Sequence, residues 1–312
     1  MNYKGDVMNI TIRQLEVFAA AARAPSFTQA AGMLGISQPA LSETIRRIEQ
    51  ELGVRLFERT TRKVALTADG RALAGLAEEV VRDVRSGLRD IAERGARRPR
   101  IAIALLPSIA SAILPQAVAG LRAQYPEAEV SVFDVLHERA AALVEEGVAD
   151  LAVTMRPVGD TLAFEPLGAD RMHLITSRGH PLAGRTPLAW AALAPFAFVA
   201  LARTTSVRRM VDNAMAAADL ALVPRYEVEQ IPSAVALVAS GLGITALPEL
   251  TFAMFPRKGV AVRPLQAPLV ARGLGLITRA GRELSPAAAA LAAAVRAAFR
   301  AAGITPGTAP PR

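Results

Sequence analysis

Three short apolar repeats near the N-terminus constrain the fold of this chain more than any other feature. Apolar residues recur at intervals of three and four within residues 15–22, 27–34 and 41–52. This spacing places them on one face of an α-helix, which turns about every 3.6 residues. The pattern predicts short helices that bury these faces against one another.

The segments between the repeats carry helix-ending and helix-starting signals. Pro25 ends the first repeat, and Ser26 begins the second with a glutamine at capping-box distance. Gly35 follows the second repeat as a turn residue. Ser37 can cap the third helix, which has a proline in its first turn. A short helix, a turn with glycine and a longer helix make up a helix-turn-helix.

This arrangement places polar and basic side chains on the outward face of the third helix, and further basic residues lie in the segment after it. If the apolar residues point inward, the outward face carries Pro39, Ser42, Glu43, Arg46 and Gln50. Such a face fits the major groove of DNA. Two short strand patterns at 56–57 and 64–66 flank a basic turn, which predicts a hairpin wing that contacts phosphate. The alternative is a small helical bundle with a solvated basic loop.

Composition narrows the class of protein. The formal net charge of +8 favours a polyanionic partner, although a basic protein need not bind nucleic acid. The chain has no cysteine, which excludes disulfides, thiolate metal sites and cysteine nucleophiles. It lacks a run of about 18 uncharged apolar residues, and its N-terminus, with Lys4 and Asp6, does not match a signal peptide. We therefore expect a cytoplasmic protein with no membrane contact.

A long amphipathic helix is predicted after residue 67. Its apolar positions recur at threes and fours, and charged residues occupy the other faces; the apolar positions are Leu73, Ala77, Val80, Val84, Leu88 and Ile91. Such a helix suits pairing with a second copy of itself. The alternative is that it packs on its own domain. Residues 95–99 contain glycine and proline and form a candidate hinge.

The pattern changes to alternating strands and helices from residue 100 onward. Continuous apolar runs at 101–105, 130–133 and 150–153 are separated by helical segments, which predicts a parallel α/β sheet. Further strand-like runs lie at 172–176, 196–199, 243–247 and 274–277.

Residues 11–73 resemble the DNA-binding domain of LysR-type transcriptional regulators nearly throughout, and the remainder to about residue 299 resembles their effector domain. The N-terminal segments are Arg13-Gln14-Leu15-x-x-Phe18, Ser26-Phe27-x-x-Ala30-Ala31, Ile36-Ser37-Gln38-Pro39-Ala40-Leu41-Ser42, Ile45-Arg46-x-Ile48-Glu49-x-x-Leu52-Gly53-x-x-Leu56-Phe57-x-Arg59 and Leu66-Thr67-x-x-Gly70. The C-terminal segments include Gly147-x-x-Asp150-Leu151-Ala152, His180-Pro181-Leu182, Gly241-Leu242-Gly243-Ile244 and Leu284-Ser285-Pro286-Ala287.

The resemblance implies an α/β multidomain protein. Its parts would be an N-terminal winged helix-turn-helix (8–67), a long linker helix with a hinge (68–97) and a C-terminal two-lobed α/β effector-binding domain (98–300), similar to periplasmic solute-binding proteins. Lobe I would comprise 100–160 and 266–300, and lobe II 161–265. We expect a disordered tail at 301–312. The similarity begins near Ile10, so Met8 is an alternative start to Met1.

By the same resemblance, the start of the third helix and the wing would contact DNA. The expected DNA-binding residues are Ser37, Gln38, Pro39, Ser42, Glu43, Arg46, Arg59, Arg62 and Lys63. Arg13 and Gln14 fit a helix start better than base contacts. Glu43 departs from the family, where a basic or polar residue is common. It can accept a hydrogen bond from cytosine, or pair with Arg46 or Arg47 and stay off the DNA.

The resemblance also places an effector between the lobes. Ser108 follows the first strand at a helix start, and Thr204, Thr205 and Ser206 precede a second helix. Helix N-termini and hydroxyls suit an anion such as a carboxylate, although plain N-capping is the alternative for each hydroxyl. His137 is expected at the cleft rim, or as an exposed loop histidine. Arg203 and Arg208 are further candidates to pair with a carboxylate.

The implied function is a transcriptional regulator with four partners: promoter DNA, a small effector, RNA polymerase and further copies in a homodimer or homotetramer. We expect no cofactor, no metal and no catalytic residues, because the three histidines are scattered and no nucleotide-binding or nucleophile motif is present. The alternatives are a solute-binding protein and an enzyme of similar two-lobed fold.

Overall fold

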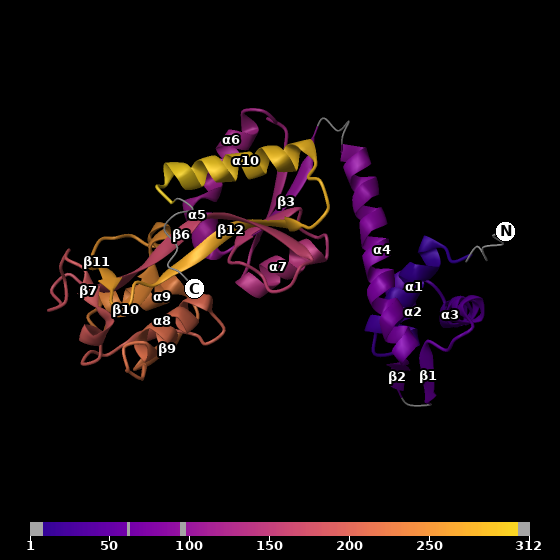
Figure 1. Ribbon diagram of the computed structural model, residues 1–312, viewed down its shortest axis with the longest axis horizontal. Helices are drawn as coiled ribbons and strands as arrows, with labels where there is room; N and C mark the ends of the chain where they lie inside the picture. Colours follow the sequence, from indigo (N-terminus) through magenta and orange to yellow (C-terminus); the bar gives the residue numbers. More distant parts are fainter. Residues whose placement is uncertain (1–8, 61–62, 94–97, 305–312) are drawn as a thin grey trace, which may run out of the picture. The chain divides into compact units, whose positions relative to one another are not determined.

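The computed structural model describes residues 9–60, 63–93 and 98–304, and Figure 1 shows its elements. The chain divides into two compact units between Ala92 and Glu93. The N-terminal unit contains α1 (Ile12–Arg23), α2 (Phe27–Leu34), α3 (Gln38–Leu52), β1 (Phe57–Thr60), β2 (Lys63–Leu66) and α4 (Ala68–Glu93).

The helix boundaries of this unit follow the local signals. The Ser26 side chain accepts a hydrogen bond from the backbone N–H of Gln29, and Gly35 ends α2 in the left-handed conformation at φ 64°. At α1, Thr11 and Gln14 form a complete reciprocal capping box. Gln14 therefore belongs to the helix start, as predicted.

The predicted apolar faces form the core of the N-terminal unit. Leu41, Ile45 and Ile48 of α3 are buried against α1 and α2. Phe57 of β1 packs edge-on against Phe18 and Phe27, with ring centroids 5.6 Å and 5.0 Å away. Edge-to-face contact of this kind favours aromatic pairs beyond their buried area. The wing is thereby joined to the helices.

Hydrogen bonds and a close backbone contact join the wing to the start of α4. The Thr67 hydroxyl donates to the Arg55 carbonyl oxygen over 2.7 Å and accepts from the Gly70 N–H over 2.9 Å. A Cβ at Gly70 would overlap the carbonyl oxygen of Leu56. Glycine is required at this position because the two backbones are in contact.

The C-terminal unit follows with an α/β arrangement. Its elements are β3 (Arg100–Leu105), α5 (Pro107–Ala112), α6 (Leu114–Arg122), β4 (Glu129–Asp134), α7 (His137–Glu145), β5 (Leu151–Thr154), β6 (Leu162–Ser177), β7 (Leu188–Ala189), η1 (Trp190–Leu193), β8 (Val199–Leu201), α8 (Ser206–Ala216), β9 (Tyr226–Val228), α9 (Ile231–Ala239), β10 (Thr245–Pro248), η2 (Glu249–Met254), β11 (Val260–Gln266), β12 (Ala271–Arg279) and α10 (Pro286–Ala301).

The main sheet runs through both lobes in the order β4-β3-β5-β12-β6-β11-β7. The first three predicted strands are parallel, as expected: β3 pairs with β4 and β5. β12 is antiparallel to β5 and β6. The first part of β6 pairs with β12, and its last part pairs with β10 and β11. β6 therefore passes from one lobe into the other within its own length, between its pairing with β12 and its pairing with β10 and β11. The division proposed at 161 falls at the start of β6, so it assigns the lobe I part of this strand to lobe II, and the division at 266 falls at the end of β11.

Each lobe has its own core. In lobe I, α10 and α6 pack together on one face of the sheet and α7 packs on the other (Figure 1). In lobe II, α8 and α9 pack with the parallel pair β8 and β9 and with Trp190, which is fully buried. In both lobes, parallel strands end at one edge, where ligands bind in open α/β sheets.

Candidate functional site

The outward face of α3 is the candidate DNA interface. Ser37, Gln38, Pro39 and Arg46 are exposed, and Ser42 is half-buried. Ser37 caps the helix by accepting from the Ala40 N–H. The Gln38 side-chain amide donates to the Ser42 hydroxyl over 2.9 Å, so the two predicted base-contacting residues are neighbours on the first turn. Both retain unused donors and acceptors for base edges.

Glu43 is the centre of an ion-pair cluster on the same face. Its carboxylate accepts from Arg46 Nη1 over 2.5 Å and from Arg47 Nε over 3.2 Å. The structure thus shows the pairing that the sequence offered as one alternative. Two cations are held beside one carboxylate on the helix surface, with a net positive charge directed to solvent.

The wing carries the remaining predicted phosphate contacts. β1 and β2 pair antiparallel, with Thr60 opposite Lys63. Arg59 lies in β1 and Lys63 in β2. Arg62 lies outside the described residues.

A cavity of about 460 Å³ lies between the two lobes of the C-terminal unit. Its size is that of a small-ligand pocket. Segments that follow β3 and β4 line it from lobe I, and segments that follow β8 and β9 line it from lobe II. The lining residues are Leu106, Pro107, Ser108, Asp134, Val135, Leu136, Leu201, Ala202, Thr204, Thr205, Ser206, Val207, Glu229, Gln230, Ile231, Pro232, Met254 and Arg272. The structure therefore brings together four of the five predicted effector residues.

Ser108 belongs to a buried polar cluster in the cavity wall. Arg272 Nη2 donates to the Ser108 hydroxyl oxygen and to Asp170 Oδ2, each over 2.6 Å. Asp170 also accepts from the Leu250 N–H over 3.1 Å. All three side chains of the cluster are buried, and Asp170 faces Arg272 in the register of β6 and β12. A buried charge pair must be hydrogen-bonded in this way, because desolvation otherwise penalises it.

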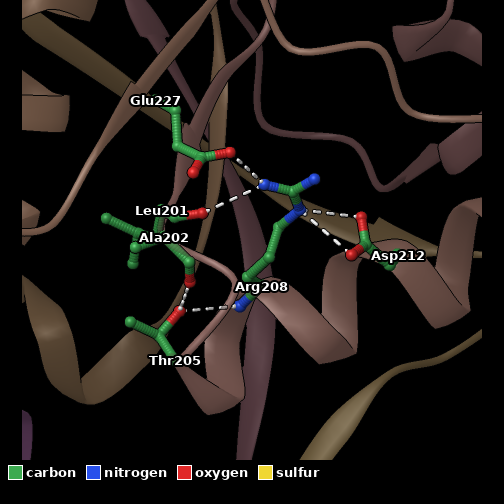
Figure 2. Close-up of polar contacts among 6 residues, drawn as sticks. All are labelled: Leu201, Ala202, Thr205, Arg208, Asp212 and Glu227. Carbon is green, nitrogen blue, oxygen red and sulfur yellow. Dashed lines mark hydrogen bonds and ion pairs between the residues drawn. The ribbon is translucent and has the colours of Figure 1, made fainter.

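Thr204, Thr205 and Ser206 line the cavity at the start of α8, but Thr205 is engaged within the protein. Its hydroxyl donates to the Ala202 carbonyl oxygen over 2.9 Å and accepts from the Arg208 N–H over 3.2 Å (Figure 2). For Thr205 the N-capping alternative is therefore the observed one. The N–H groups of Ser206 and Val207, in the first turn of α8, have no partner inside the helix, and both residues line the cavity.

Arg208 does not line the cavity. Its guanidinium is buried, with Nε donating to Asp212 over 2.9 Å and Nη1 donating to Glu227 and to the Leu201 carbonyl oxygen (Figure 2). Burial lowers its pKa, but the hydrogen bonds to the two carboxylates outweigh this and raise it. Arg208 therefore joins the start of α8 to β8 and β9, and its guanidinium is engaged within the protein. Arg203 is exposed and is not among the lining residues.

His137 also lies apart from the cavity lining. Its Nδ1 lies 3.0 Å from the hydroxyl oxygen of Thr154, a fully buried residue of β5. Burial lowers the pKa of His137; nearby Glu138 raises it and Arg209 lowers it. α7 directs the ring toward β5, and the ligand contact expected of His137 stays a prediction. Beside it, Arg209 of α8 pairs with Glu138 of α7 over 3.1 Å, which joins the two lobes at the surface.

Two carboxylates line the cavity without an ion-pair partner among the described residues. Asp134 ends β4 and Glu229 follows β9. Burial raises the pKa of Asp134 above its usual value of 3.8. Both residues are exposed, so water also solvates their carboxylates.

The sequence did not reveal four of the charged groups in and behind the cavity wall. Asp134 is the last residue of β4 and Glu229 directly follows β9, positions that could have marked them as cavity residues. Asp170 and Arg272 lie inside strands, so their position in the sequence does not mark them as residues at the end of a strand, where cavity residues are expected. A charged residue within an otherwise apolar strand pattern is the available signal, because such a residue requires a buried partner.

Two further observations concern other kinds of site. Across the described ranges, no cluster of three or more His, Asp or Glu side chains is placed to hold a metal ion. No helix in the same ranges combines the length and the apolar character that a membrane crossing needs.

Comparison with known proteins identifies the family. The family model described as LysR substrate binding domain matches residues 94–300, and the bacterial regulatory helix-turn-helix protein, lysR family, model matches residues 12–71. The Escherichia coli protein described as uncharacterized HTH-type transcriptional regulator YbhD is 31% identical over 283 residues, covering 90% of this chain and 89% of that protein. The hydrogen peroxide-inducible genes activator of Haemophilus influenzae is 30% identical over 245 residues, covering 77% and 81%.

The solved structures agree on the fold. A full-length OxyR variant from Pseudomonas aeruginosa superposes with a TM-score of 0.66 at 21% identity, covering 97% of this chain and 99% of that chain. The chain belongs to the LysR family of transcriptional regulators. It is a DNA-binding regulator with an effector-binding domain, and not an enzyme or a solute-binding protein.

Proposed function

We propose that the regulator contacts promoter DNA with the first turns of α3 and with the wing. The exposed Gln38–Ser42 pair supports a base-contacting role, because amides and hydroxyls bond base edges in the major groove. Arg59, Arg62 and Lys63 of the wing would contact phosphate. Neutralising Arg62 or Lys63 should weaken binding to all sequences and lower the salt slope by about one each, whereas changing Gln38 or Ser42 should alter sequence preference.

The cavity between the lobes would hold a small effector that carries a carboxylate. The observation that carries this proposal is the convergence of Ser108, Arg272 and the free N–H groups of α8 on one cavity. Donors at a helix start favour a negative group, and their geometry is already set by burial.

The composition excludes one kind of switch. One similar protein is described as a hydrogen peroxide-inducible genes activator. The present chain contains no cysteine, so it cannot respond through thiol oxidation. We propose that ligand binding biases the arrangement of the lobes, and with it DNA bending and the access of RNA polymerase.

Self-association would use α4. Leu88, on the predicted apolar stripe, is 63% exposed, and Leu76 is 54% exposed. Large apolar side chains on a long helix favour pairing with a second copy, and two recognition helices are needed for a palindromic site. We propose a homodimer or homotetramer that acts in the cytoplasm, where promoter DNA lies.

The test combines DNA binding with one pair of variants. Gel shifts and footprints on DNA beside the regulator's own gene should show a protected site that changes when a panel of small carboxylates is added. Ser206→Pro removes one free N–H at the first position of α8, where proline is tolerated, while Ser206→Ala keeps it. We expect Ser206→Pro to weaken carboxylate binding about tenfold relative to Ser206→Ala. Equal binding by both variants would remove α8 from the anion site.

A further inference from the structure

A half-buried carboxylate lies at the junction between the recognition helix and the wing. Glu49, in the second half of α3, has 12% of its side chain exposed. Its Oε1 atom accepts hydrogen bonds from the backbone N–H groups of Leu56 over 2.8 Å and Phe57 over 3.4 Å. Its Oε2 atom lies 3.7 Å from Arg55 Nη1. The carboxylate of Glu49 therefore holds the backbone at the point where β1 begins.

Glu49 differs in this respect from Glu43 on the same helix. Glu43 pairs at the surface with two arginine side chains, which are both part of α3. Glu49 instead binds main-chain donors of another element, seven and eight residues further along the chain. Hydrogen bonds to an ionised carboxylate are about twice as strong as neutral ones. The contacts of Glu49 thus fix the backbone of the wing and not merely the direction of a side chain.

The wing needs contacts of this kind because it is a hairpin of two strands, β1 and β2. An isolated two-stranded hairpin is only marginally stable in water, so the contacts at its base set its direction. The tip, where Thr60 faces Lys63, lies three residues from Phe57, a reach of about 10 Å in an extended strand. A rotation of about 10° at the base would move the tip by about 2 Å, which is enough to break a hydrogen bond to phosphate.

The peptide groups of Leu56 are held from two sides. Its N–H donates to Glu49 of α3, and its carbonyl oxygen accepts from the N–H of Thr67, at the start of α4, over 3.0 Å. The ring of Phe57 packs in the core of the unit. Among these contacts, that of Glu49 joins the wing directly to the helix whose outward face is the candidate DNA interface.

We infer that Glu49 is a positioning residue for DNA recognition: it fixes the wing relative to α3, so that both elements can contact one duplex at the same time. This inference rests on the proposed contact of the wing with phosphate and deepens it. On charge alone, removing a carboxylate from a DNA-binding unit should tighten binding, because a repulsion is lost. Removing Glu49 should instead weaken binding, because the wing loses its direction. The sign of the change separates the two effects.

The first measurement is the affinity of the full chain for the DNA beside its own gene, by gel shift. Glu49→Ala should weaken binding about tenfold, and Glu49→Gln, which keeps one oxygen acceptor, about threefold. Glu43→Gln is the matched control: it removes the same charge from the same helix and should tighten binding about two- to fivefold. Glu49 variants that tighten binding as this control does would overturn the inference.

The second measurement is a double-mutant cycle with Lys63→Gln, read as the change in affinity between 50 and 200 mM salt. In the parent chain, Lys63→Gln should lower the salt slope by about one. In the Glu49→Ala chain it should lower the slope by less than about half as much, because the wing no longer holds Lys63 at a phosphate. A role of Glu49 in stability alone would leave this contribution unchanged.

Thermal unfolding identifies the variants that are folded at the assay temperature, and if Glu49→Ala is not folded, Glu49→Gln takes its place in the cycle. A slope change of about one in both backgrounds would show that the wing keeps its place without Glu49. That result overturns the inference and leaves the proposed phosphate contact intact. If Lys63→Gln does not change the slope of the parent chain, both the phosphate contact at Lys63 and the inference are overturned.

Discussion

The recognition face of α3 and the wall of the effector cavity hold their polar groups in opposite ways. On α3, Gln38 bonds to Ser42 and Glu43 to Arg46, within a single turn of helix and at the surface. In the cavity wall, Arg272 bonds to Ser108 and Asp170, which are 164 and 102 residues away and are buried.

This difference separates side chains that can be substituted with little loss of stability from side chains that cannot. Exposed ion pairs contribute little to stability, because water solvates each partner when the pair is broken. Breaking a buried pair leaves an uncompensated charge in a medium of low dielectric constant. A regulator can therefore vary its DNA contacts at little cost to folding, while the cavity wall must be conserved as a unit for the lobe to fold.

The largest expected effect is that of Arg272→Met. It leaves Asp170 charged and buried, so the free energy of unfolding of the C-terminal unit should fall by about 3–5 kcal/mol in urea titrations. The matched control is Arg209→Met, which breaks the exposed pair with Glu138 and should cost less than about 1 kcal/mol. Similar losses of unfolding free energy in both variants would show that the buried pair and the exposed pair contribute equally to stability.

Gly70→Ala should have the next largest effect, on the N-terminal unit. The added Cβ overlaps the Leu56 carbonyl oxygen at the junction of wing and α4, which should cost about 1–3 kcal/mol of stability and weaken DNA binding. Gly75→Ala is the control: it lies in α4 with open space around it, and should stabilise the helix by about 0.5–1 kcal/mol. Thermal unfolding of the two variants measures the difference, and a stabilised Gly70→Ala protein would show that the contact is not tight.

Glu43→Gln should change DNA binding rather than stability. Release of Arg46 and Arg47 lets both reach phosphate, so binding should tighten about two- to fivefold on every sequence. Glu79→Gln, at an exposed position of α4, serves as the control in the same gel shifts. A loss confined to sites with one particular cytosine would instead assign Glu43 to that base.

The smallest effect is expected from the titration of His137. Because burial lowers its pKa in the folded chain, the unfolded chain binds the proton first as pH falls below 6.5, and the free energy of unfolding decreases. We expect the parent chain to lose more stability than His137→Asn between pH 7 and pH 5, measured by urea titration at each pH. The pKa of His180 is also lowered by burial, and since that histidine is common to both proteins its contribution cancels.

Much of the fold could be predicted because its signals are local. The repeats, the caps at Ser26 and Ser37 and the turn at Gly35 each involve residues within one or two helical turns. The first three strands of the effector domain were likewise marked by continuous apolar runs. The cavity residues Ser108, Thr204 and Ser206 followed from their places after strands, once the family fold was assumed.

The remaining site residues depended on contacts between distant segments. His137 and Arg208 were plausible ligand contacts in the sequence, yet Thr154 and the pair Asp212 and Glu227 engage them inside the protein. The contact of His137 has no local signal, because a side chain at a helix start can turn toward the ligand or toward the core with the same backbone. For Arg208 the spacing to Asp212, four residues on in α8, was a local signal, whereas Glu227 comes from β9.

The sequence by itself determined the helix-turn-helix, the wing, the α/β alternation and the exclusion of thiol chemistry, since spacing, capping residues and composition are sufficient for these. The tertiary structure decided which charges meet. The register of β6 and β12 places Asp170 against Arg272, and the packing of the two lobes brings Asp134 and Glu229 to one cavity. These contacts join residues far apart in the chain, and their energies depend on burial, which only the folded protein defines.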